Sequence, residues 1–125
     1  MTENEISYKI RGAIFKVFNA LGPGLLESAY EAALAFELKK AGLRVSQQVQ
    51  LPLNYEGINL EVGYRIDLLV EDLVIIELKS IEKISAIHHK QVLTYLKLSG
   101  RKLGILVNFN CVAIDKAIFR KVNGL

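Results

Sequence analysis

The chain has 125 residues, of which 51% are hydrophobic and 23% charged, so we expect one domain over residues 1–125 that fills its core without disulfides or a structural metal. Its single cysteine, Cys111, excludes an internal disulfide and a zinc site of the Cys-x-x-Cys type. The formal net charge of +3 permits binding to a polyanion, and without a signal peptide or an apolar run of membrane-span length we expect a cytoplasmic protein that binds no membrane.

Two amphipathic helices are expected at the start of the chain. From Glu5 to Leu21, apolar residues recur every three or four positions, which is the spacing of one helix face. Gly22-Pro23-Gly24 ends this helix. A second helical pattern runs from Leu25 to Ala41, and Gly42 stands where a C-terminal cap is expected.

Extended segments follow the helices. The pattern from Leu43 to Leu53 predicts a strand, and Asn54-Tyr55-Glu56-Gly57 predicts the turn to a second strand of a hairpin. A further extended run covers roughly Ile58 to Val70. The continuous, β-branched run from Leu73 to Leu78 has the composition of a buried central strand.

The last third of the chain predicts one more helix and two more strands. Ala86 to Leu98 returns to helical spacing, and Leu103 to Phe109 and Val112 to Phe119 are predicted strands separated by Asn110-Cys111. Counted in this way, the element order is ααββββαββ. The predicted fold class is therefore α/β, in the sense of an α+β mixed sheet flanked by helices.

An acid and a base stand in the predicted central strand, where burial of charge is costly. Side chains alternate along a strand, so Glu77 and Lys79 face the same side. Asp67 lies in the preceding strand. If Glu71-Asp72-Leu73 is a three-residue hairpin loop, Asp67 lies opposite Glu77, whereas a two-residue loop turns it away unless a bulge compensates.

Two carboxylates in a low-dielectric setting repel each other until one takes a proton or a cation joins them. Magnesium suits such a pair, because it takes a few carboxylate oxygens and retains waters, one of which can attack a phosphodiester. Lys79 can orient that water, lower its pKa or stabilise charge on the phosphate. A strand-end salt bridge between Glu77 and Lys79, with Asp67 as a turn acid, explains the same residues equally well.

Polar residues on two predicted helices complete the set of candidates. Glu27 lies in the first turn of the second helix, where it either favours the helix dipole or faces a metal cleft, and Tyr30 shares its face. His88, Gln91 and Tyr95 project from one side of the third helix. They are candidates for contact with phosphate or a base, or else ordinary surface and partial core.

Several of these residues form motifs that resemble the GxxExxY proteins, a branch of the PD-(D/E)XK nuclease superfamily. The motifs are Gly24-x-x-Glu27-x-x-Tyr30, Asp67, Glu77-x-Lys79 and Gln91-x-x-x-Tyr95. The likeness spans roughly Ile6 to Arg120. It includes Gly22-Pro23-Gly24-Leu25-Leu26-Glu27, the Tyr64-Arg65-Ile66-Asp67-Leu68 strand and the Leu103-to-Phe109 strand.

The resemblance implies a restriction-endonuclease-like core with a role for each matching residue. Asp67 and Glu77 are expected to bind Mg²⁺, for which Mn²⁺ can substitute, and Glu27 to help hold the metal. Lys79 is expected to serve the attacking water. The remaining two motif residues, Gln91 and Tyr95, look like the Gln-x-x-x-Tyr helix of recombination-type exonucleases in the superfamily, where the pair supports the site or substrate.

The leading functional hypothesis is a magnesium-dependent nuclease that hydrolyses phosphodiester bonds of DNA, with RNA as the second choice. The alternative is a non-catalytic nucleic-acid-binding or protein-interaction module that retains the nuclease fold, since members of one fold differ in function. A third hypothesis is a structural subunit that forms a homo-oligomer through an exposed strand or helix.

Overall fold

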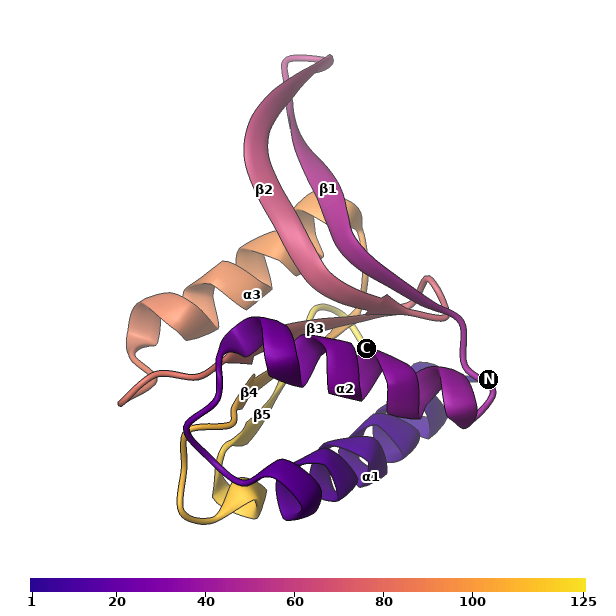
Figure 1. Cartoon of the computed structure of the whole chain (residues 1–125). Coiled ribbons are helices and arrows are strands. Elements are labelled where there is room, and N and C mark those ends of the chain that lie inside the picture. Colours follow the sequence, from indigo (N-terminus) through magenta and orange to yellow (C-terminus); the bar gives the residue numbers. More distant parts are fainter.

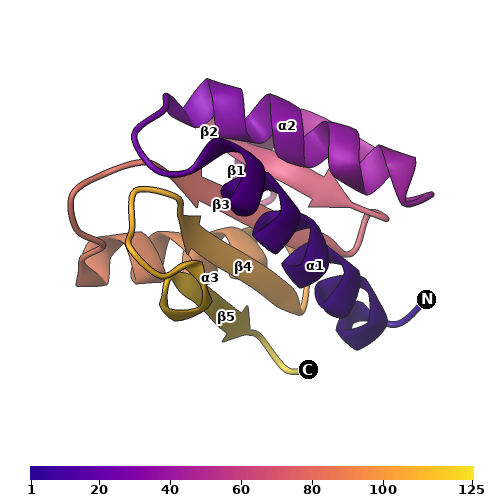
Figure 2. The same cartoon turned by 60° about the horizontal axis from the view of Figure 1, so that its bottom comes forward.

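The computed structural model describes residues 1–125 as three α-helices packed on a five-stranded sheet. Helices α1 (Glu3–Leu21) and α2 (Glu27–Lys40) lie on one face of the sheet, and α3 (Ala86–Ser99) lies on the other (Figures 1 and 2). This arrangement is the predicted α+β fold with a mixed sheet, consistent with a restriction-endonuclease-like core. No helix has both the length and the apolar character needed to cross a membrane.

The strands lie in the sheet in chain order, β1-β2-β3-β4-β5. They are β1 (Val45–Tyr55), β2 (Ile58–Val70), β3 (Val74–Lys79), β4 (Leu103–Asn108) and β5 (Ile118–Val122). Only β3 and β4 are parallel, and the other neighbours are antiparallel. Helix α3 is the crossover that a parallel pair requires, so the carboxyl ends of β3 and β4 meet at one edge of the sheet.

Two sequence predictions about strands are wrong. The second hairpin strand and the extended run from Ile58 are the same strand, β2, so three strands rather than four precede α3. The predicted strand Val112–Phe119 is mostly a loop with a 3-10 turn at Ile114–Lys116, and β5 begins only at Ile118. The loop buries Ile114 and Ala117 against the core without strand pairing, which explains why an apolar pattern there did not mark a strand.

Apolar faces of α1 and α2 form the main core with alternate residues of the sheet. Ile6, Ile10 and Ile14 of α1 are fully buried in it. Helix α1 begins at Glu3, earlier than predicted, because Thr2 and Glu5 form a capping box in which each side chain accepts from the other's backbone N–H. A smaller cluster on the opposite face packs α3 against β1, β2 and β3.

The β1–β2 hairpin extends beyond the rest of the sheet (Figure 1). At its tip, Glu56 and Gly57 have φ of 52° and 79°, as the type I′ turn of a tight hairpin requires. The register shifts between the Leu51↔Tyr64 and Leu53↔Leu60 pairs, so β2 holds extra residues there. The tip consequently exposes apolar side chains, which are Tyr55, Ile58, Leu60 and Val62.

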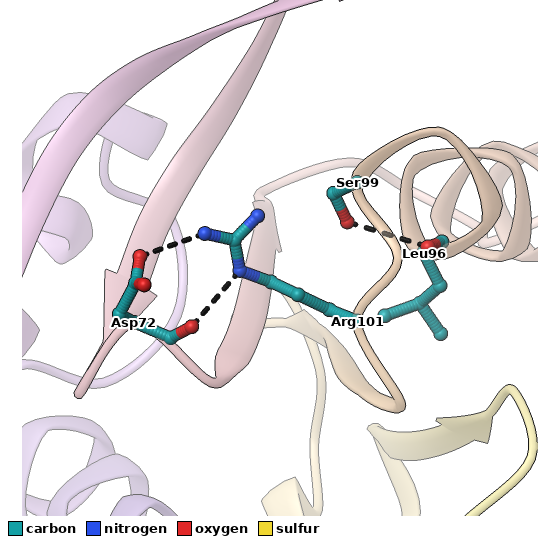
Figure 3. A network of polar contacts seen from close by, with 4 residues as sticks. All are labelled: Asp72, Leu96, Ser99 and Arg101. Carbon is teal, nitrogen blue, oxygen red and sulfur yellow. Dashed lines mark hydrogen bonds and ion pairs between the residues drawn. The ribbon is translucent and has the colours of Figure 1, made fainter.

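The loop between β2 and β3 is fixed by contacts to other parts of the chain. Leu73 N–H donates to Val70 O at 3.0 Å and closes the turn. The Arg101 guanidinium donates to both the side chain and the backbone carbonyl of Asp72, at 2.7 and 3.1 Å (Figure 3). The Asp72 side chain is 77% exposed, so this pair adds little stability, but it orients the loop that sets the β2–β3 register.

We predict that Gly104→Ala destabilises the protein by about 1–3 kcal/mol. A Cβ at Gly104 of β4 would lie 2.7 Å from Val92 Cγ1 of α3, and a β-branched valine has little freedom to move aside. Gly12→Ala is the matched control, because a Cβ there meets nothing within 4 Å and alanine favours helix α1. Urea unfolding measures both variants. Equal stability of Gly104→Ala and the wild type would contradict tight packing of α3 on β4.

Candidate active site

Asp67 of β2 and Glu77 of β3 lie opposite each other, where the pairing of these two strands ends. Val70 pairs with Val74 and Leu68 with Ile76, which confirms the predicted three-residue loop and makes Asp67 and Glu77 the next pair in this register. Asp67 N–H donates to Glu77 Oε1 at 3.1 Å, and Leu78 N–H donates to Asp67 Oδ2 at 2.9 Å. Each carboxylate thus replaces a backbone hydrogen bond of the ladder.

The environment of Glu77 disfavours its charged form. Its side chain is buried, with the residue 4% exposed. Burial first, and then the neighbouring charge of Asp67, raise the pKa of Glu77 to about 8, although the hydrogen bond from Asp67 N–H and then the charge of Lys79 partly offset them. In the protein without a cation, Glu77 therefore carries a proton at neutral pH. No protein group donates to its second oxygen, Oε2, so that oxygen remains free for a ligand.

Lys79 is free of any ion pair in this structure. The ion pairs of the protein are Lys16–Glu37, Arg44–Glu71 and Arg101–Asp72. The interpretation of Glu77 and Lys79 as a strand-end salt bridge is therefore wrong. The ammonium group is partly exposed on the same face of β3 as Glu77, where it remains available to a substrate.

Gln48 holds the other oxygen of Asp67, and sequence reasoning missed it. Its amide Nε2 lies 3.3 Å from Asp67 Oδ1 and 2.6 Å from Glu31 Oε1 of α2, while Gln47 Nε2 lies 3.0 Å from Glu31 Oε2. Gln48 has φ of 51°, which a non-glycine residue rarely adopts. The only sequence signal for these contacts was that Gln47 and Gln48 are two consecutive polar residues in a predicted strand.

Glu27 is the first residue of α2, and its carboxylate points to the end of β3. Glu27 Oε2 accepts a hydrogen bond from Ser80 N–H at 3.2 Å, and Ser80 directly follows Lys79. No three acidic, histidine or cysteine side chains form a cluster that could hold a metal ion. The structure thus brings Asp67 and Glu77 together and places Glu27 beside Lys79, without joining Glu27 to the acidic pair.

Tyr30 is buried and supports the turn before Glu27. Its residue is fully buried, and its ring stacks on Phe109 with centroids 4.4 Å apart. Its hydroxyl donates to Gly22 O and accepts from Leu25 N–H. These contacts fit a role for Tyr30 in supporting the site.

The polar residues of α3 lie together, as their spacing predicted. Gln91 Nε2 donates to the Tyr95 hydroxyl at 3.0 Å. Burial first, and then the charges of Glu77 and Asp67, raise the pKa of Tyr95 above its ordinary value, so this hydroxyl belongs to the surroundings of the acidic pair. His88 is a capping residue, since its Nδ1 accepts from Ser85 N–H at 3.0 Å, and it borders the same pocket as Gln91 and Tyr95.

The donor set at the strand ends fits a divalent cation of the magnesium type. Mg²⁺ commonly takes one or two carboxylates and keeps several waters, and Asp67 and Glu77 supply two carboxylates that repel each other without it. A buried pair of this kind is typical of a functional site rather than of a stabilising contact. Glu27 fits a supporting position rather than a third direct ligand in this conformation.

Comparison with known proteins gives one match. A family model described as the PD-(D/E)XK nuclease superfamily matches residues 4–121. No curated protein and no solved structure matches the chain. The matched range runs from the first turns of α1 into β5 and includes the acidic pair, Lys79 and Glu27.

Proposed function

The chain belongs to the PD-(D/E)XK nuclease superfamily, and from this we propose that it is a magnesium-dependent nuclease that hydrolyses phosphodiester bonds of DNA. Nucleases of the superfamily typically use divalent metals. The observation that carries the proposal is the facing pair Asp67 and Glu77, in which burial and like charge raise the pKa of Glu77 to about 8. The Gly24, Glu27 and Tyr30 spacing supports a place in the GxxExxY branch.

Each residue at the strand ends has a distinct task in this proposal. Asp67 and Glu77 would hold the cation, which when bound supplies Lewis-acid polarisation of the scissile phosphate and lowers the pKa of water. Lys79 orients the attacking water and stabilises the negative charge that grows on the phosphate. Gln48 fixes the orientation of the Asp67 carboxylate, and Glu27 restrains the backbone that follows Lys79.

DNA is the proposed substrate, with RNA as the second choice. The net charge of +3 is compatible with a polyanion, and the lone ammonium of Lys79 beside the acidic pair suits a phosphodiester. A non-catalytic module that retains the fold remains the alternative to be tested. Cleavage assays on single- and double-stranded DNA and RNA with Mg²⁺ or Mn²⁺ test the proposal directly, and no cleavage of any of them would contradict it.

We expect the affinity for Mn²⁺ or Mg²⁺ to increase with pH up to about 8. Below that pH Glu77 holds a proton that must leave when the cation binds, so binding near pH 7 should release about one proton. Calorimetric titration in buffers of different ionisation enthalpy measures this release. Asp67→Asn should abolish binding, whereas Glu56→Gln, at the distant hairpin tip, should not.

The dependence of nucleic-acid binding on the cation separates the nuclease from the non-catalytic module. Nucleic-acid binding that needs no cation and is unchanged in Asp67→Ala would favour the module. Cation binding that survives Asp67→Asn with the same affinity and the same pH dependence would contradict the proposed metal site.

A further inference from the structure

A pocket of about 290 Å³ lies between Tyr64 of β2 and helix α3. Tyr64 supplies one side of it from β2, and α3 supplies the rest. The lining residues from α3 are Ile87, His88, Lys90, Gln91, Thr94 and Tyr95. Of these residues, only Gln91 and Tyr95 belong to the family motifs, and His88 was a candidate from helical spacing. The tasks proposed above leave the open space of the pocket unused.

The walls of the pocket combine flat apolar surface with polar groups at its rim. Tyr64 is 40% exposed and Ile87 is 66% exposed, so both present apolar surface to solvent. The rings of Tyr64 and Tyr95 lie with centroids 5.8 Å apart and tilted by 51°, and Tyr95 is nearly buried. Tyr64 is therefore the ring that a flat ligand can stack on.

The pocket is connected to the acidic pair through Tyr95. The charges of Glu77 and Asp67 both act on the Tyr95 hydroxyl, and the Gln91 amide donates to that hydroxyl from within the pocket. On the exposed side, Lys90 adds a positive charge. A ligand with a flat aromatic part and an attached anion would meet stacking surface and a cation in this pocket, whose Tyr95 feels the charges of the acidic pair.

We propose that this pocket binds one unpaired nucleobase, stacked on Tyr64, so that the preferred substrate is single-stranded DNA or an unpaired end. The inference rests on the proposed nuclease function and names its substrate class. Every base has an aromatic face, so stacking accepts many sequences. A base inside a duplex has both faces covered by its neighbours and reaches such a pocket only when it leaves the stack.

The inference is tested by the fluorescence of 2-aminopurine in a single-stranded oligonucleotide, titrated with protein in EDTA. Stacking on Tyr64 should quench the fluorophore. Tyr64→Ala should weaken binding by about 10- to 100-fold, whereas Tyr64→Phe should retain it. Tyr55→Ala is the matched control, because Tyr55 is a 60% exposed tyrosine of the same hairpin that does not line the pocket.

A second variant keeps the inference testable if Tyr64→Ala does not fold. Ile87 is on the exposed first turn of α3, so Ile87→Ser removes apolar wall without disturbing the core, and it should weaken binding several-fold. Wild-type affinity in either Tyr64→Ala or Ile87→Ser would overturn the inference. Because EDTA prevents cleavage, binding tests the pocket alone, and a wild-type protein that quenches the probe but never cuts DNA would instead contradict the nuclease proposal.

Discussion

Lys79→Ala is expected to lower the rate of phosphodiester cleavage by about 10²- to 10³-fold, the usual effect of removing one group that stabilises transition-state charge. The free energy of unfolding should change by less than about 1 kcal/mol. The reason is that the Lys79 ammonium has no ion-pair partner in the protein, so its removal leaves no charge unpaired. Single-turnover cleavage at saturating Mg²⁺, together with urea unfolding, measures both quantities.

Lys97→Ala provides the matched control for this substitution. Lys97 is an exposed lysine in the last turn of α3, so its removal changes the net charge by the same amount. If both variants lose cleavage equally, the effect is one of overall charge. If Lys79→Ala cuts DNA at the wild-type rate, Lys79 is not a catalytic residue.

The parts of the site that depend on local pattern were accessible from the sequence. Strand alternation placed Glu77 and Lys79 on one face, and the three residues between Val70 and Val74 set the register that faces Asp67 to Glu77. Helical spacing joined Gln91 to Tyr95. In each case, a short-range rule of backbone geometry determines which side chains meet.

The parts that depend on long-range contacts were not accessible. Gln48 contacts Asp67 and Glu31 because β1 pairs with β2 and because its own backbone is left-handed, which no residue pattern predicts. Tyr30 shares the helix face of Glu27 by spacing, yet Phe109, which is far along the chain, stacks on its ring in the core. Apolar content alone likewise could not distinguish the loop around Ile114 from a strand.

Glu77→Gln is expected to change stability and activity in opposite directions. In the folded protein the pKa of Glu77 is about 8, against a usual value of 4.5. Between these two values the folded state keeps a proton that the unfolded state has lost, so the stability of the metal-free wild type falls as pH rises through this window. The loss should amount to about 3–5 kcal/mol by pH 9.

A glutamine at position 77 cannot ionise, so urea unfolding in EDTA should show no such loss for Glu77→Gln between pH 5 and pH 9. Its oxygen can still accept from Asp67 N–H, which keeps the fold intact. The exposed Glu61 of β2 provides the control, since Glu61→Gln should follow the wild-type curve. Mg²⁺ should restore the stability that the wild type loses at pH 9 and should leave the stability of Glu77→Gln unchanged. Glu77→Gln should also lose cleavage. A metal-free wild type equally stable at both pH values would mean that Glu77 ionises at no cost, and the need for a cation between the two carboxylates would disappear with it.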